Sequence, residues 1–137
     1  MKGDEMTICI RPYRESDYEI ICSWWREHKE TPPLPGMMVE DGTFVVEVGG
    51  CPVMTMTVFT TQSKEISYFE GYCSEPGLEK KFRNTIGKSL WEHCYTYLRD
   101  RGYKRVLIFT EKHKLVKRYE ELGMRQNVYV HSLGRVL

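Results

Sequence analysis

The residues best suited to bind a ligand form a basic cluster just before an amphipathic segment. Residues 77–88 contain four cations: Lys80, Lys81, Arg83 and Lys88. They lead into a stretch with helical periodicity, and backbone N–H groups at a helix N-terminus attract anions such as phosphate. This arrangement favours a site for a phosphate or pyrophosphate group. A solvated helix surface would carry the same charges, so that alternative stays open.

Charge is divided unevenly along the chain. The 137 residues carry 20 Lys and Arg against 19 Asp and Glu, a net charge of +1. Residues 1–79 hold 6 basic and 14 acidic side chains, whereas residues 80–118 hold 12 basic and 3 acidic ones. The near-neutral total argues against a general attraction to nucleic acid or membrane. The separation favours a localised anion site in the second half, unless folding interleaves the two kinds of charge.

Two more residues whose side chains could take part in a reaction lie in a β-rich segment. Glu70 lies between Tyr68 and Tyr72, where a carboxylate can accept a proton from an amine, directly or through a water molecule. A solvent-facing glutamate is the alternative. Cys73 can be considered as a nucleophile, but nothing next to it in the sequence would activate its thiol, which favours a buried cysteine.

The cysteine and histidine patterns exclude several classes of protein. The five cysteines are odd in number and lack CxxC spacing, and the four histidines form no HxH or HxxxH pair. The sequence therefore predicts neither a disulfide framework nor a metal site, and it favours a reducing cytoplasm. No apolar run approaches the roughly 20 residues of a membrane helix. The composition is typical of one folded domain over residues 1–137.

Strands and helices alternate in the pattern that must position these residues. Strands are expected at 6–10, 43–48, 53–61, 66–73, 105–110 and about 124–133, and helices at about 16–29, about 84–101 and 115–122. Ser16 and Glu19 predict a capping box for the first helix, and Gly49-Gly50 predicts a tight hairpin turn. The order β-α-β-β-β-α-β-α-β predicts an α/β domain (an α+β mixed sheet) with helices on both faces.

This order resembles the GNAT superfamily of acyl-CoA-dependent N-acetyltransferases over essentially the whole chain. Three segments carry the resemblance: Ile10-Arg11-Pro12 near the start of the chain, Ile86-Gly87-Lys88-Ser89-Leu90, and Tyr119-Glu120-Glu121-Leu122-Gly123-Met124. The second is similar to the helix entry of the family's pyrophosphate loop, and the third to its "YEKLGF" segment. Trp24-Trp25 followed by Pro32-Pro33-Leu34-Pro35-Gly36 is also similar to short phage and prophage members.

The pyrophosphate segment departs from the family pattern. The family has Arg or Gln, two residues, Gly, one residue and Gly. Anchored on Gly87, this chain has Phe82 at the first position and Thr85 at the first glycine. Threonine obstructs the close approach of a phosphate and restricts φ, while Arg83 is one residue away from the missing arginine. With these departures, the segment is expected to bind CoA weakly or not at all.

The resemblance implies acetyl-CoA as the co-substrate and a primary amine, on a small molecule or a protein, as the acceptor. It implies that Tyr119 protonates the leaving thiolate, that Glu70 is the base and that backbone N–H groups of 71–73 hold the carbonyl oxygen. Tyr119 also fits a purely structural role, on an apolar face with Leu115 and Leu122. The other implied site residues, for the cofactor, are Tyr72, Cys73, Lys81, Arg83, Asn84, Thr85, Ile86, Gly87 and Lys88.

The acceptor site can be considered from the residues themselves. Trp24 and Trp25 cannot both face the core from one helix, so one of them is a candidate to line an acceptor pocket together with Leu34. Packing of that tryptophan under the proline-rich loop is the alternative.

Two rival functions remain. One is a GNAT-like binding module without catalysis, which the imperfect phosphate segment would suit. The other is contact with nucleic acid through residues 80–118, with Trp91 and Tyr95 available for stacking. It ranks last because these aromatics are expected on the inner flank of their helix. If the acidic residues 1–79 line the acceptor site, they would favour a cationic acceptor. No contact with a membrane is expected. The sequence leaves open whether the protein forms a homodimer.

Overall fold

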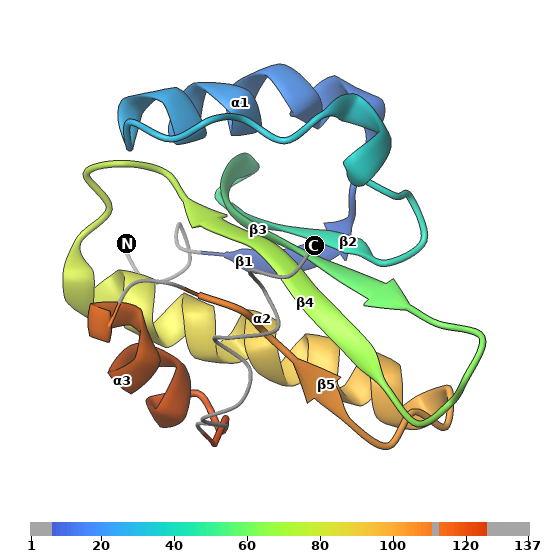
Figure 1. Cartoon of the computed structure of the whole chain (residues 1–137). Helices are drawn as coiled ribbons and strands as arrows, with labels where there is room; N and C mark the ends of the chain where they lie inside the picture. The colour runs from blue at the N-terminus through green and yellow to red at the C-terminus, as the bar shows by residue number, and fades with distance from the viewer. Residues whose placement is uncertain (1–6, 111–112, 126–137) are drawn as a thin grey trace.

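A five-stranded sheet forms the centre of the fold (Figure 1). The computed structural model describes residues 7–110 and 113–125. The strands are β1 (Ile8–Pro12), β2 (Thr43–Val48), β3 (Cys51–Thr60), β4 (Ser67–Ser74) and β5 (Val106–Leu107), in the order β1-β2-β3-β4-β5. Neighbouring strands are antiparallel except β4 and β5, which are parallel.

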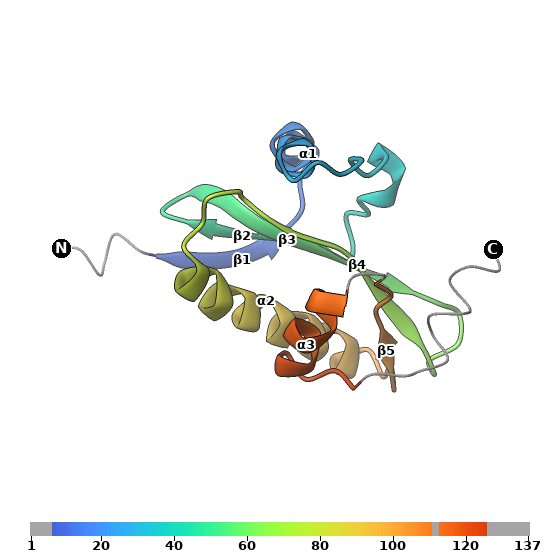
Figure 2. The same cartoon turned by 60° about the vertical axis from the view of Figure 1, so that its left-hand side comes forward.

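Helices cover both faces of this sheet. Helix α1 (Tyr18–Glu27) lies on one face, and α2 (Lys80–Asp100) and α3 (His113–Glu121) lie on the other (Figure 2). Short 3-10 turns at Glu15–Asp17 and Pro35–Met37 flank α1 and its connection to β2. The expected mixed α/β order is confirmed through α3. The strand expected at about 124–133 falls, beyond Arg125, outside the described residues.

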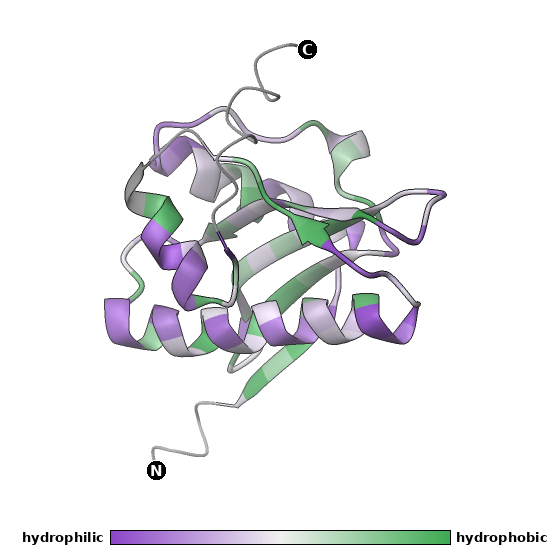
Figure 3. Cartoon of the chain, turned by 60° about the horizontal axis from the view of Figure 1, so that its bottom comes forward, coloured by the Kyte–Doolittle hydropathy of each residue, from purple (hydrophilic) through white to green (hydrophobic). Residues whose placement is uncertain are grey.

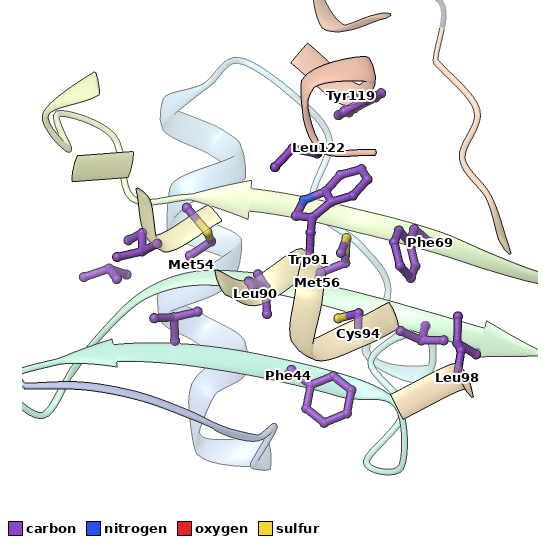
Figure 4. Close-up of a cluster of buried hydrophobic side chains, with 14 residues drawn as sticks. Phe44, Met54, Met56, Phe69, Leu90, Trp91, Cys94, Leu98, Tyr119 and Leu122 are labelled. Carbon is purple, nitrogen blue, oxygen red and sulfur yellow. The ribbon is translucent and has the colours of Figure 1, made fainter. Parts of the chain in front are cut away.

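Each side of the sheet has its own hydrophobic cluster. The cluster under α2 and α3 surrounds Trp91, which Figure 4 shows between Phe69 and Leu122. The expected α2 face is confirmed, because Ile86, Leu90, Cys94 and Leu98 are all buried. Hydrophilic and hydrophobic residues interleave along α2, as expected of an amphipathic helix (Figure 3). The second cluster packs α1 on the opposite face through Ile21, Trp24 and Val45.

The β2–β3 hairpin closes as the sequence predicts. Gly49 and Gly50 have φ of 58° and 84°, and a two-residue turn with positive φ at both positions matches the right-handed twist of its strands. Phe44 and Val46 then face α2, whereas Val45 between them faces α1.

The two largest differences from the expected boundaries concern α2 and β5. Helix α2 begins at Lys80 rather than about residue 84, because residues 80–86 contain neither Gly nor Pro and Phe82 and Ile86 pack on the cluster under α2. Strand β5 covers only Val106–Leu107 instead of 105–110.

The start of α1 is fixed by an ion-pair network rather than by the expected capping box. Ser16 and Glu19 are exposed, and Asp17 instead accepts a 2.8 Å hydrogen bond from the backbone N–H of Arg14. Arg11 donates to both carboxylate oxygens of Asp17, at 2.9 and 2.7 Å, and to Glu47 at 2.6 Å. The network ties β1, β2 and the turn before α1 together.

Candidate active site

A β-bulge in β4 decides which side chains share a face of the sheet. Thr55 pairs with Cys73 and Thr57 pairs with Glu70, so β4 has one more residue than β3 between these pairs. Gly71 has a φ of +67° there, in the left-handed region that glycine adopts without steric cost. The bulge lies within the segment whose N–H groups were expected to hold a carbonyl oxygen.

The bulge reverses the alternation of β4. Simple alternation places Tyr72 with Glu70, and Cys73 with Phe69. Instead, Tyr72 joins Phe69 in the cluster under α2, and Cys73 joins the cluster under α1. The expected alternation of 66–73 is therefore wrong after Glu70, because one extra residue shifts the period of two by one step.

The bulge lies on a part of β4 that is open along one edge. Strand β5 pairs with β4 only through Ser67 and Tyr68. Among the described residues, no strand pairs with the rest of this edge. Such an edge presents main-chain N–H and C=O groups to an extended ligand.

Three aromatic rings meet on the side of α2 and α3. The ring centroid of Trp91 lies 5.3 Å from that of Tyr119 and 5.4 Å from that of Tyr72. Figure 4 shows Tyr119 and Leu122 of the α3 region above Trp91. Burial raises the pKa of Tyr119 to about 12, and Tyr72 and Glu70 add to the effect. Tyr119 is therefore protonated at neutral pH and can act as a proton donor.

Gly87 makes room for two polar groups at this junction. A Cβ at Gly87 would lie 2.5 Å from Tyr72 Oη and 2.9 Å from Arg118 Nη2. Arg118 Nη2 is buried and has no hydrogen-bond partner within residues 7–110 and 113–125. Burial raises the pKa of Tyr72, and the positive charge of Arg118 opposes that shift. Arg118 was not among the expected site residues, and its only signal in the sequence is its position next to Tyr119.

The phosphate-binding residues expected at 84–88 lie inside α2. Their N–H groups bond to carbonyls four residues earlier, and Ile86 and Gly87 are buried. The N–H groups open to an anion belong to the first turn, after Glu79, whose side chain makes no capping hydrogen bond. Lys81 is exposed and Arg83 half-buried near this turn. The backbone N–H groups that could bind an anion are therefore those of the first turn, at 80–82, rather than those of 84–88.

A pocket of about 520 Å³ opens on the other face of β4, beside α1. It is lined by Trp25, Thr31, Pro32, Pro33, Leu34, Met37, Met38, Thr57, Phe59, Glu70 and Gly71. Of the two tryptophans considered for the acceptor, Trp25 lines the pocket, whereas Trp24 is only 1% exposed and belongs to the core. Leu34 also lines the pocket. The pocket meets β4 at the bulge.

The structure also bears on two alternative roles: Cys73 as a nucleophile, and Trp91 and Tyr95 as aromatic residues that stack on nucleic-acid bases. Burial raises the pKa of the Cys73 thiol to about 12, so this cysteine is not an activated nucleophile. Trp91 is 0% exposed, and the half-buried ring of Tyr95 packs against Phe69 and Trp91, with ring centroids 5.5 and 6.2 Å away, which disfavours stacking on a base.

Two other kinds of site are absent from the described residues. They contain no group of three or more metal-ligating side chains. No helix among them combines the length and apolar character that crossing a bilayer requires.

Comparisons with known proteins rest on structure. No protein-family model matches the chain, and no curated protein sequence matches it. The structure is similar to Ard1 from Thermoplasma volcanium, with a TM-score of 0.69, 15% identity and coverage of 88% of this chain and 84% of that one. It is also similar to a GCN5-related N-acetyltransferase from Ralstonia eutropha, with a TM-score of 0.63, 16% identity and coverage of 88% of this chain and 94% of that one.

A third similar structure contains CoA. It is N-acetylglutamate synthase from Neisseria gonorrhoeae in complex with coenzyme A and L-arginine, with a TM-score of 0.71 and 16% identity. The match covers 90% of this chain and 28% of the synthase. At such identities the likeness is one of fold. The chain therefore has the fold of the GNAT superfamily of N-acetyltransferases.

Proposed function

We propose that the protein is an N-acyltransferase that moves an acetyl group from acetyl-CoA to a primary amine. The observation that carries this proposal is the bulge at Gly71. It turns Tyr72 toward Tyr119, on the face opposite to Glu70, whose exposed side chain lines the pocket, and this part of the strand has an unpaired edge among the described residues. An amine acceptor and a thioester can therefore approach the same point from two sides.

The residues present fit acetyl-CoA. The open edge of β4 would hold the amide-bearing arm, and the first turn of α2 with Lys80, Lys81 and Arg83 would hold the pyrophosphate. A buried guanidinium nitrogen without a partner is costly, so Arg118 Nη2 favours a ligand that brings a hydrogen-bond acceptor. When bound, acetyl-CoA supplies an acetyl group activated as a thioester.

The chain's own residues then supply the proton transfers. Glu70 accepts a proton from the amine, directly or through a water molecule, as the new C–N bond forms. Backbone N–H groups of 71–73 hold the carbonyl oxygen at the bulge. Tyr119 gives its proton to the sulfur as the C–S bond breaks.

A CoA-binding module without catalysis is the second candidate. It is favoured by the helical conformation of 84–88 and by Thr85 at a position where the family has glycine, because both reduce the backbone contacts open to a pyrophosphate.

Calorimetric titration with CoA and a thiol-release assay with acetyl-CoA and primary amines separate these candidates. For the transferase, CoA at about 100 times its Kd should raise the free energy of unfolding by roughly 2.7 kcal/mol, and free thiol should appear only when an amine is present. Binding without thiol release from any amine would support the module. If CoA neither binds in the titration nor raises the melting temperature at saturating concentration, both the transferase and the binding module are contradicted.

A further inference from the structure

The pocket beside α1 is apolar except at one wall. Most of its lining is tryptophan, proline, leucine, methionine and phenylalanine, and Glu70 is the one ionisable side chain among its lining residues. Thr57 is buried and shares a 2.9 Å hydrogen bond with the hydroxyl of Thr43. Trp25 Nε1 is buried without a hydrogen-bond partner among the described residues. Apart from this one N–H donor, a ligand in this pocket would meet one negative charge and little other polarity.

One carboxylate in an apolar wall discriminates between kinds of amine. An ammonium group next to Glu70 has an ionic partner, but a second cationic group deeper in the pocket would lose its hydration without a counter-charge. Peptide groups would meet the same difficulty, because each buried amide needs hydrogen-bond partners. The lining thus disfavours polyamines and peptide N-termini.

The roof of the pocket is a proline-rich segment that holds apolar side chains out of the core. The Tyr18 hydroxyl donates to the carbonyl of Pro33 at 2.8 Å, which fastens the segment to α1. Leu34 is 69% exposed and Met37 is 42% exposed, although both line the pocket. An apolar substituent would cover these two side chains, and methionine adapts readily to varied shapes.

Building on the proposed function, we infer that the acceptor is a small primary amine with a single positive charge and an apolar substituent. Its amino group lies at Glu70, and its aromatic or branched aliphatic substituent lies between Trp25 and Phe59, under Leu34 and Met37. The pocket volume of about 520 Å³ is within the range of small-molecule sites.

Acetylation rates of four acceptors test this inference. With acetyl-CoA, 2-phenylethylamine should give a kcat/KM about tenfold or more above those of ethylamine, spermidine and a short peptide with a free N-terminus. Leu34→Ser should reduce that preference. Ile20→Ser, which truncates a 41% exposed side chain of α1 outside the pocket, is the matched control and should leave it unchanged.

The outcomes separate this inference from the proposed function. Faster acetylation of spermidine or of the peptide would overturn the inference and leave the transferase standing. If no amine is acetylated, calorimetric binding of 2-phenylethylamine decides: binding that Leu34→Ser weakens and Ile20→Ser does not would support the pocket assignment, even though the transferase had failed. No binding, or equal binding to both variants, would overturn it.

Discussion

At the scale of single residues, Gly71 and Gly87 decide how the site is assembled. Gly71 adopts the positive φ that moves Tyr72 to the face of Tyr119, and Gly87 leaves the space that Tyr72 Oη and Arg118 Nη2 approach. The sequence singles out Gly87, but as a residue that contacts a phosphate. Its burial inside α2 indicates a packing role instead, because its backbone is already hydrogen-bonded within the helix.

Tyr119→Phe should lower the rate of thiol release by about 100-fold or more, since it removes the proposed proton donor. CoA affinity, measured by calorimetry, should change little. Tyr103→Phe is the matched control, because that hydroxyl donates to the carbonyl of Thr61 at 2.9 Å rather than taking part in the site. Unchanged turnover in Tyr119→Phe would leave Tyr119 with a packing role only.

Gly87→Ala should reduce turnover while changing the free energy of unfolding by no more than about 1 kcal/mol. Alanine favours the helix by roughly that amount, but its Cβ forces Tyr72 and Arg118 to move. Thermal unfolding and thiol release provide the two measurements, with Ser89→Ala on the exposed side of α2 as the control. Normal turnover with loss of binding to 3′-phospho-ADP would instead indicate a phosphate contact.

At the scale of elements, the end of α1 and the segment after it build the roof of the pocket. Lys29 has a φ of 65°, the Glu30 N–H donates to the carbonyl of Trp25 at 2.9 Å, and the Lys29 N–H donates to that of Arg26 at 2.9 Å. This is a Schellman motif, which usually has glycine at the left-handed position. His28 Nε2 also lies 2.9 Å from the carbonyl of Ser74, which joins this helix end to β4.

Lys29→Gly should raise the free energy of unfolding by about 1 kcal/mol, because a side chain with a Cβ is strained in the left-handed region. Urea denaturation of both proteins measures the difference. Lys29→Ala removes the charge but keeps the Cβ, so it should give no comparable gain. Equal gains in the two variants would show that the charge, and not the backbone, is responsible.

At the scale of the whole molecule, the two halves of the charge pattern form different elements. The acidic first part of the chain forms β1 to β4 and α1, whereas the basic part forms β5 at the edge of the sheet and the helices α2 and α3 on the face opposite to α1 (Figure 2). The two parts also meet, because Asp41 lies 3.9 Å from Arg101 of the basic part. The Arg11 network joins β1, β2 and the turn before α1, and holds the acidic side together.

Asp17→Asn should lower the free energy of unfolding at neutral pH by about 3 kcal/mol, because it breaks a buried ion pair. Burial by itself raises the pKa of Asp17, but the hydrogen bonds from Arg11 and Arg14 outweigh it and lower that pKa. Its stabilisation is therefore present above the unfolded value of about 3.9 and is lost as the pH falls through the lowered pKa.

Denaturation of wild type and Asp17→Asn at a series of pH values measures their difference in free energy of unfolding. This difference should become smaller as the pH falls below about 4. Glu15→Gln, an exposed change in the same turn, should have the same pH dependence as wild type. A gap that stays constant into acid would contradict the assignment.

The sequence by itself determined the element order, the Gly49-Gly50 hairpin, the buried face of α2 and the position of Tyr119 on an apolar helical face. These features depend on local periodicity and turn chemistry, which a single chain displays directly. Tertiary structure decided which tryptophan lines the pocket, the partner of Asp17 and the juxtaposition of Tyr72, Gly87 and Arg118. It also decided the bulge, because an extra residue in β4 is defined only against its pairing with β3, and everything after Gly71 changes face as a result.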